Sequence, residues 1–182
     1  MLLVCGSLRS KSTNAAALRT AQRVAPVGVA ATVYEGLATL PHFNPDDDVE
    51  PLPPAVAELR EAIRDADALC FSTPEYAGAL PGSFKNLLDW TIGDDDVGSI
   101  YEKPVAWINV SPRGAVHAHE SLRLVLGYAH ADIVEAACVH VPLNHADVGE
   151  DGLVSDPAAR AAISFAIEQL IAARASSSGL IP

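Results

Sequence analysis

Short apolar runs alternate along the chain with longer segments in which apolar residues recur every three or four positions. The runs predict five strands, at 2–5, 27–34, 68–72, 104–110 and 133–141. The periodic segments predict helices at 12–24, 55–66, 82 to about 90, 119–128 and 157–173. Strands that alternate with helices in this way are typical of a parallel sheet covered on both faces. We therefore expect an α/β fold, a three-layer α/β/α sandwich around a five-stranded parallel sheet.

The segments between these elements are polar or broken by proline and glycine. The connection 41–54 is rich in Pro and Asp and predicts no regular structure, and 93–98 predicts an acidic surface loop. Ser12 is a candidate N-cap for the first helix, and Ser155 or Asp156 for the last one. We expect one domain at 1–175 and a flexible C-terminal tail at 176–182.

Composition places the chain among globular proteins. Of its 182 residues, 49% are hydrophobic and 19% are charged, which is enough apolar surface for one core. No segment has the roughly 18 uninterrupted apolar residues of a membrane span, and Arg9 and Lys11 follow the first apolar run rather than precede it. These features predict a cytoplasmic protein that neither spans a membrane nor carries a signal peptide.

The formal net charge of -11 argues against nucleic acid and anionic membranes as partners, because both are bound mainly through Lys and Arg. The three cysteines, Cys5, Cys70 and Cys138, lie in predicted strands and form no CxxC pair. They predict buried free thiols rather than a disulfide framework or a zinc site.

The turn after the first strand, 6–14, carries the chemistry of an anion site. Hydroxyls, an amide and a guanidinium surround a predicted helix start, whose free N–H groups already favour an anion. Gly6 is the only glycine in this turn, so it is not the GxGxxG loop of a dinucleotide site. Ser10 precedes Lys11 and Ser12 where a Walker loop has glycine. The turn therefore predicts a site for a single terminal phosphate.

Two more loops follow the third and fourth strands. The loop 73–82 contains two prolines and two glycines, and its Tyr76 offers an aromatic face to a planar ring. The loop 111–119 is placed to approach the other edge of such a ring. His117 and His119 are too few to predict a metal site.

The helix at 82–90 is apolar around most of its circumference. Its Phe84, Leu87, Leu88 and Trp90 predict either ordinary core packing or a face that meets another subunit.

Three motifs resemble the NADPH-dependent FMN reductase family, a flavodoxin-like group that includes bacterial quinone, chromate and azo-dye reductases. They are GSLRSKSTN at 6–14, PEYAGALPGSFKNLLDW at 74–90 and KPVAWINVSP at 103–112. The resemblance covers nearly the whole chain in order, including GEDGLVSD before the last helix.

The resemblance implies a flavodoxin-like fold and a set of FMN-binding residues. It implies contacts to the phosphate from Ser7, Arg9, Ser12, Thr13 and Asn14, and to the ring from Pro74, Glu75, Tyr76, Ala77, Gly78, Ser111, Arg113 and Gly114. Two positions depart from the family. Ala77 stands where Asn is usual, and Pro112-Arg113-Gly114 stands where paired glycines are usual.

The implied activity is that of an NAD(P)H-dependent FMN oxidoreductase. Bound flavin carries the chemistry, so no catalytic side chain is expected. The acceptor would be a small molecule such as a quinone, free flavin, azo compound or metal oxyanion. NADH and NADPH are not distinguished by the sequence, although Arg113 and Lys85 are candidate cations for the additional phosphate of NADPH. The resemblance also implies a homodimer or homotetramer.

Two other functions remain compatible with the sequence. A flavodoxin-like electron carrier would suit the acidic surface, but it has no need of the long 74–90 element. A non-catalytic binding module on the same fold is the second alternative, because a fold does not determine a function.

Overall fold

The structure is a computed structural model, which describes residues 1–94 and 97–178, with side chains described as far as Ala173. Its strands are β1 (Leu2–Cys5), β2 (Thr32–Tyr34), β3 (Leu69–Ser72), β4 (Pro104–Asn109), β5 (Asp132–Ile133) and β6 (Val139–His140). They form a parallel sheet in the order β2-β1-β3-β4-β5, with β6 also paired to β4. This order is that of a flavodoxin-like sheet, so the predicted fold class is confirmed.

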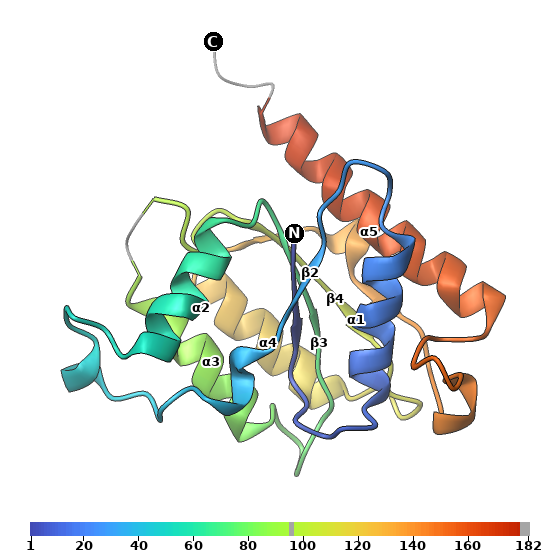
Figure 1. The fold of residues 1–182 in the computed structure, drawn as a ribbon, viewed down its shortest axis with the longest axis horizontal. Helices are drawn as coiled ribbons and strands as arrows, with labels where there is room; N and C mark the ends of the chain where they lie inside the picture. The colour runs from blue at the N-terminus through green and yellow to red at the C-terminus, as the bar shows by residue number, and fades with distance from the viewer. Residues whose placement is uncertain (95–96, 179–182) are drawn as a thin grey trace.

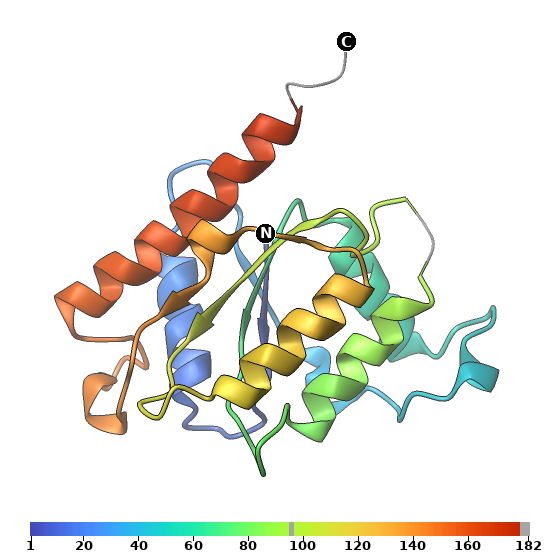
Figure 2. The ribbon, with the colours of Figure 1, turned by 180° about the vertical axis from the view of Figure 1, so that it is seen from behind.

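Within the described residues, five α-helices cover the two faces of the sheet. They are α1 (Thr13–Val24), α2 (Pro54–Arg64), α3 (Gly82–Ile92), α4 (Val116–Tyr128) and α5 (Pro157–Ser178). Figure 1 shows α1 and α5 on one face and α2, α3 and α4 on the other. The view from behind in Figure 2 shows α3 and α4 lying next to one another.

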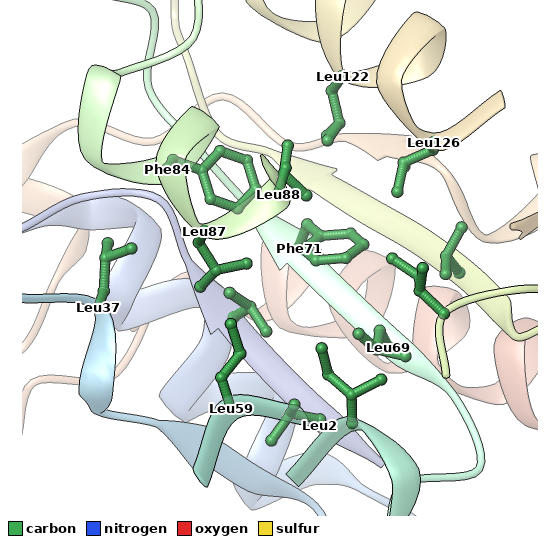
Figure 3. Packing of buried hydrophobic residues seen from close by; sticks show 14 of the residues in the cluster. Leu2, Leu37, Leu59, Leu69, Phe71, Phe84, Leu87, Leu88, Leu122 and Leu126 are labelled. Atoms are coloured by element: carbon green, nitrogen blue, oxygen red, sulfur yellow. The ribbon is translucent and has the colours of Figure 1, made fainter. Parts of the chain in front are cut away.

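Each face of the sheet has its own buried core. On one face, Phe71 of β3 packs with Phe84 and Leu88 of α3 and with Leu122 and Leu126 of α4 (Figure 3). On the other face, the buried side chains of α1 and α5 pack on Leu3, Cys70 and Ile108. The central strands are therefore buried on both sides, which explains why their sequences are continuous apolar runs.

The predicted second and fifth strands are both shorter than expected. β2 begins only at Thr32, because the chain turns before it: Val29 N–H donates to Pro26 O, and Gly28 has a φ of +90°. The predicted strand 133–141 is divided into β5 and β6 by a 3₁₀ helix, Glu135–Ala137. Both halves pair with β4, so the interruption leaves the topology unchanged.

Several element boundaries also differ from the prediction. α4 begins at Val116 rather than His119, directly after Ala115, whose backbone is left-handed. The connection 41–54 contains a short 3₁₀ helix, Pro45–Asp47. α5 continues to Ser178, so the first three residues of the expected tail are helical, and 179–182 lie outside the described residues. Residues 95 and 96 of the acidic loop also lie outside them.

The large apolar side chains of helix α3 belong to the core and not to an exposed face. Phe84, Leu87, Leu88 and Trp90 are each at most 1% exposed, so the hypothesis that they meet another subunit is wrong. Trp90 also donates from Nε1 to Pro41 O at 2.9 Å, which fixes the connection 41–54 against the helix.

The three cysteines are free thiols. Cys70 is fully buried as expected, whereas the expected burial of Cys5 and Cys138 is wrong, because both are only half-buried. Burial raises the pKa of Cys70 to about 12 and that of Cys138 to about 11, so both remain protonated near neutral pH. No helix among the described residues is long and apolar enough to cross a membrane.

Candidate functional site

The loops after β1, β3 and β4 meet at the carboxyl edge of the sheet, at the lower edge of the molecule in Figure 1. They enclose a cavity of about 290 Å³, here called the loop cavity. Its lining includes most of the predicted residues, namely Ser7, Arg9, Ser12, Thr13, Asn14, Pro74, Glu75, Tyr76, Ser111 and Arg113. Ala77, Gly78 and Gly114 lie in the same loops but do not line it.

The position of the loop cavity follows from the strand order. The chain leaves β1 toward β2 on one side and then returns to β3 on the other side of β1. The connections on the two sides of this switch point diverge, which opens a crevice at the carboxyl ends of the strands.

At one end of the loop cavity lies the N-terminus of α1. Ser12 is the N-cap, and its hydroxyl accepts from Ala15 N–H at 3.4 Å. The N–H groups of Thr13 and Asn14, in the first turn, have no acceptor within the helix. The first turn of α1 contains no acidic residue. These free donors and the positive end of the helix dipole together make this end suitable for an anion.

Two guanidinium groups add positive charge to the loop cavity. Arg9 and Arg113 both line it, and neither has a carboxylate partner within residues 1–94 and 97–173. By contrast, Lys85 forms an ion pair with Asp89 on α3 and does not line this cavity. Lys85 is therefore not placed to meet a phosphate here, whereas Arg9 and Arg113 are.

The Gly6–Asn14 turn is held tightly against β3. A Cβ atom on Gly6 would lie 2.4 Å from Thr73 Oγ1 and 2.9 Å from Phe84 Cγ, so only glycine fits there. The buried hydroxyl of Ser72 lies 2.7 Å from Ile108 O and 3.0 Å from Asn14 Oδ1, so it connects the start of α1 to the sheet.

The loop after β3 ends in a tight turn. Tyr76 and Ala79 exchange both backbone hydrogen bonds, Tyr76 N to Ala79 O at 3.0 Å and Ala79 N to Tyr76 O at 3.1 Å. Between them Ala77 has a φ of 51° and Gly78 a φ of 71°, as in a type I′ turn. The Tyr76 N–H is thus engaged within the loop, whereas the N–H groups of Ala77 and Gly78, like those of Glu75 and Leu80, make no hydrogen bond among the described residues.

Glu75 links this loop to helix α4. Its Oε2 accepts from Ala118 N–H at 3.0 Å, in the first turn of a helix whose N-cap residue, Ala115, has no capping side chain. The carboxylate therefore satisfies a free N–H group and meets the positive end of the α4 dipole. Because of this contact, Glu75 orients the loop in addition to lining the cavity.

The loop after β4 is shaped by two residues that the sequence analysis missed. Asn109 donates from Nδ2 to Gly114 O at 2.6 Å and accepts from Ser111 N at 3.0 Å. His140, on the neighbouring strand β6, has its Nε2 at 2.8 Å from Ser111 O. Asn109 had a detectable signal, since an Asn at the end of a strand often bonds to the backbone of the turn that follows. His140 had none, because only the β4–β6 pairing brings it there.

His145 is a further residue that the sequence did not indicate. It belongs to the 3₁₀ helix His145–Asp147, which follows β6, and it lines the loop cavity opposite the Gly6–Asn14 turn. A histidine facing an anion site can contribute a donor and, when protonated, a positive charge.

His117 and His119 lie in different environments. His117 is exposed, with its Nδ1 at 3.6 Å from Glu120 Oε2, whereas His119 is buried and packs on Trp107. His119 Nδ1 lies 2.8 Å from Ala115 O, and burial lowers its pKa below the ordinary value. No group of three candidate metal ligands occurs among the described residues.

The residues present fit FMN in their chemistry. Helix N–H groups, hydroxyls and the Arg9 guanidinium lie at one end, and the loops that carry Tyr76 and Arg113 lie at the other. The volume of about 290 Å³ is just below the roughly 300–1,000 Å³ of ligand pockets. With Tyr76 46% exposed, the ring end is open to solvent and to a second small molecule.

Known proteins resemble this chain in sequence and in fold. Residues 1–146 match the model of the NADPH-dependent FMN reductase family. A quinone reductase of Pseudomonas putida is 34% identical over 144 residues, which are 77% of this chain and 73% of that one. A NAD(P)H-dependent FMN reductase of Pseudomonas aeruginosa is 43% identical over 90 residues, but the match spans only 48% of its length.

A solved structure is similar over most of its length. It is the flavoenzyme NAD(P)H:(acceptor) oxidoreductase FerB from Paracoccus denitrificans, with a TM-score of 0.80 and 25% identity over 94% of this chain and 96% of that one. The match to the family model spans the three loops of the site and all of the strands. The chain therefore belongs to the NADPH-dependent FMN reductase family.

Proposed function

We propose that this protein is an NAD(P)H-dependent FMN oxidoreductase that reduces quinones. The observation that carries the proposal is the loop cavity, which joins a phosphate-type site to a stiff, open loop with an aromatic side chain. Family membership and the names of the quinone reductase relatives support the same assignment.

Different residues of the cavity are proposed to bind the phosphate and the ring of the cofactor. The Thr13 and Asn14 N–H groups, the Ser7 and Ser12 hydroxyls and Arg9 bind the phosphate. On the ring side, the loops after β3 and β4 would contact the flavin from two sides. The N–H groups of Ala77 and Gly78, at the exposed rim outside the cavity lining, would meet negative charge on it. When bound, FMN would supply the redox chemistry that links hydride transfer from NAD(P)H to reduction of the acceptor.

The open ring end suits a reaction in which donor and acceptor use the same place in turn. Tyr76, Ala77 and Gly78 are all exposed, and no described segment covers them. Such a site selects an acceptor by planarity and redox potential more than by shape. Quinones fit this requirement, and free flavin, azo compounds and metal oxyanions are further candidate acceptors to be assayed alongside them.

The proposal is tested by the spectrum and the turnover of the purified protein. We expect the yellow absorbance of bound flavin, bleaching on addition of NADH or NADPH, and recovery of the absorbance on addition of a quinone. Flavin that bleaches only with chemical reductants would identify an electron carrier instead. A colourless protein that takes up no FMN would identify a non-catalytic module.

The phosphate end is tested by replacing Arg9. In Arg9→Ala, FMN should bind about tenfold to hundredfold more weakly, because one charge-assisted hydrogen bond is worth about 1.5–3 kcal/mol. Riboflavin, which lacks the phosphate, should bind both proteins equally. Arg23→Ala is the matched control, since Arg23 is an exposed cation of α1 that lines none of the cavities described here. Equal FMN affinity in Arg9→Ala and wild type would contradict the assignment.

We also propose that the protein forms a homodimer or homotetramer through α4. Leu124 and Tyr128 are 75% and 74% exposed and border an apolar groove of about 460 Å³ between α3 and α4. Large apolar side chains grouped beside a groove are typical of association surfaces.

A further inference from the structure

A second cavity opens from the phosphate end of the loop cavity. Its volume is about 660 Å³, and we call it the annex. One wall carries Arg9, Lys11, Ser12 and Arg19, and the other carries His145 and Glu150. Arg9, Ser12 and His145 line both cavities, whereas the ring-side residues Pro74, Glu75, Tyr76 and Ser111 line only the loop cavity. A ligand that fills both must therefore extend beyond its phosphate and away from the ring.

The annex is lined by a group of positively charged side chains, which is unusual in this acidic protein. The chain has a formal net charge of -11, yet Arg9, Lys11 and Arg19 line one side of the annex. Within residues 1–94 and 97–173 none of these three has a carboxylate partner, whereas Arg60, Lys85 and Arg123 each form an ion pair. Cations left unpaired in an acidic protein indicate a place for an anionic ligand.

The walls of the annex suit more than a bare anion. The 149–152 loop approaches α1 closely, since a Cβ atom on Gly152 would lie 3.7 Å from Arg19 Nη1. Glu150 is the acidic residue of the lining, and a carboxylate in a nucleotide site accepts hydrogen bonds from ribose hydroxyls. The volume lies within the roughly 300–1,000 Å³ of small-molecule sites.

We propose that the annex binds the adenylate half of FAD, so that this chain accepts FAD as well as FMN. The proposal rests on the proposed function, because the flavin and its first phosphate occupy the loop cavity in both cofactors. The second phosphate lies beside Lys11 and Arg19, the ribose beside Glu150, and His145 stands where the two cavities join.

Calorimetric titration of flavin-free protein with FMN, FAD and riboflavin tests the proposal. We expect FAD to bind wild type at least as tightly as FMN. Lys11→Ala should weaken FAD by about three- to tenfold, as for loss of a partly exposed ionic contact, and FMN by less than about twofold. Lys11 lines the annex but not the loop cavity, and Arg23→Ala is again the control that should change neither affinity.

Three results would overturn the proposal. The first is FAD that binds wild type about tenfold more weakly than FMN. The second is an equal loss of FMN and FAD affinity in Lys11→Ala. The third is a KM for NADPH that rises in Lys11→Ala with an unchanged ratio of FAD to FMN affinity, which would assign the annex to the donor. Failure of FMN itself to bind would instead contradict the proposed function, so the two failures are distinguishable.

Discussion

Ala77 has the conformation of a left-handed residue, which costs an alanine about 1–2 kcal/mol. Asparagine and glycine adopt that conformation more easily, and Asn-Gly is the preferred pair of a type I′ turn. The departure from the family at this position therefore affects the conformation of the turn. An Asn at position 77 would adopt this conformation with less strain, so its absence leaves the loop 73–82 less stable.

We expect Ala77→Asn to raise the free energy of unfolding by about 0.5–1 kcal/mol, because the strain of the turn is relieved. Chemical denaturation measures the change. Ala79→Asn, two residues later and without a positive φ, is the matched control and should give no increase. An unchanged or lower stability in Ala77→Asn would mean that the turn is not strained in solution.

His119 predicts a pH dependence of stability. Burial lowers its pKa in the folded protein below the ordinary 6.5, so the unfolded chain binds more protons as the pH falls through that value. The contribution of neutral His119 is thus complete above about pH 6.5 and is progressively lost below it. Between pH 7.5 and pH 5.5 the wild type should lose more stability than His119→Gln. If the free energies of unfolding of the two proteins change equally with pH, protonation of His119 does not destabilise the folded protein.

At the scale of elements, two buried cationic side chains donate hydrogen bonds to carbonyl groups at the C-terminal ends of helices. Arg60 of α2 donates from Nε and Nη2 to Trp90 O near the end of α3, at 3.1 and 3.0 Å. Its Nη2 also lies 2.7 Å from Asp48 Oδ1, so the guanidinium joins α2, α3 and the connection 41–54. Buried Lys103 likewise donates to Ile63 O and Ala66 O at the end of α2.

Arg60→Met should lower the free energy of unfolding by about 3 kcal/mol, because it leaves the largely buried Asp48 carboxylate without its partner. Lys85→Met breaks the more exposed pair with Asp89 and should cost less than about 1 kcal/mol. Adding Asp48→Ala to Arg60→Met should restore part of the loss. A cost for Arg60→Met no larger than for Lys85→Met would show that the cluster is hydrated.

At the scale of the whole molecule, the most exposed apolar side chains beside the α3–α4 groove are Leu124 and Tyr128 of α4. We expect light scattering at micromolar concentration to give a dimer or tetramer, and Leu124→Glu with Tyr128→Glu to shift it to the monomer. Val27→Glu is the control, since Val27 is fully exposed and lines none of the described cavities. A monomeric wild type would contradict the expected assembly.

Patterns within single segments account for what the sequence predicted well. The alternation of strands and helices gave the layers, since the apolar period depends only on local geometry. The helix start and the polar side chains of the 6–14 turn could be placed together because they lie within one short segment, and their binding of a phosphate stays a prediction. The elements predicted least accurately were β2 and the strand 133–141, where Gly28 and the 3₁₀ turn Glu135–Ala137 interrupt apolar runs.

Amino-acid order alone therefore determined the fold class, the phosphate-type turn and the loops that follow the strands. Only the tertiary structure shows which residues from distant parts of the chain contact those loops. Glu75 reaches the first turn of α4 from 43 residues away, and His140 and His145 reach the site only because the chain returns beside β4. The annex is decided in the same way, since its two walls come from opposite ends of the chain. The local pattern of apolar and polar residues depends on the conformation of its own segment. Contacts between distant residues depend on how the whole chain packs, so they cannot be read from a short segment.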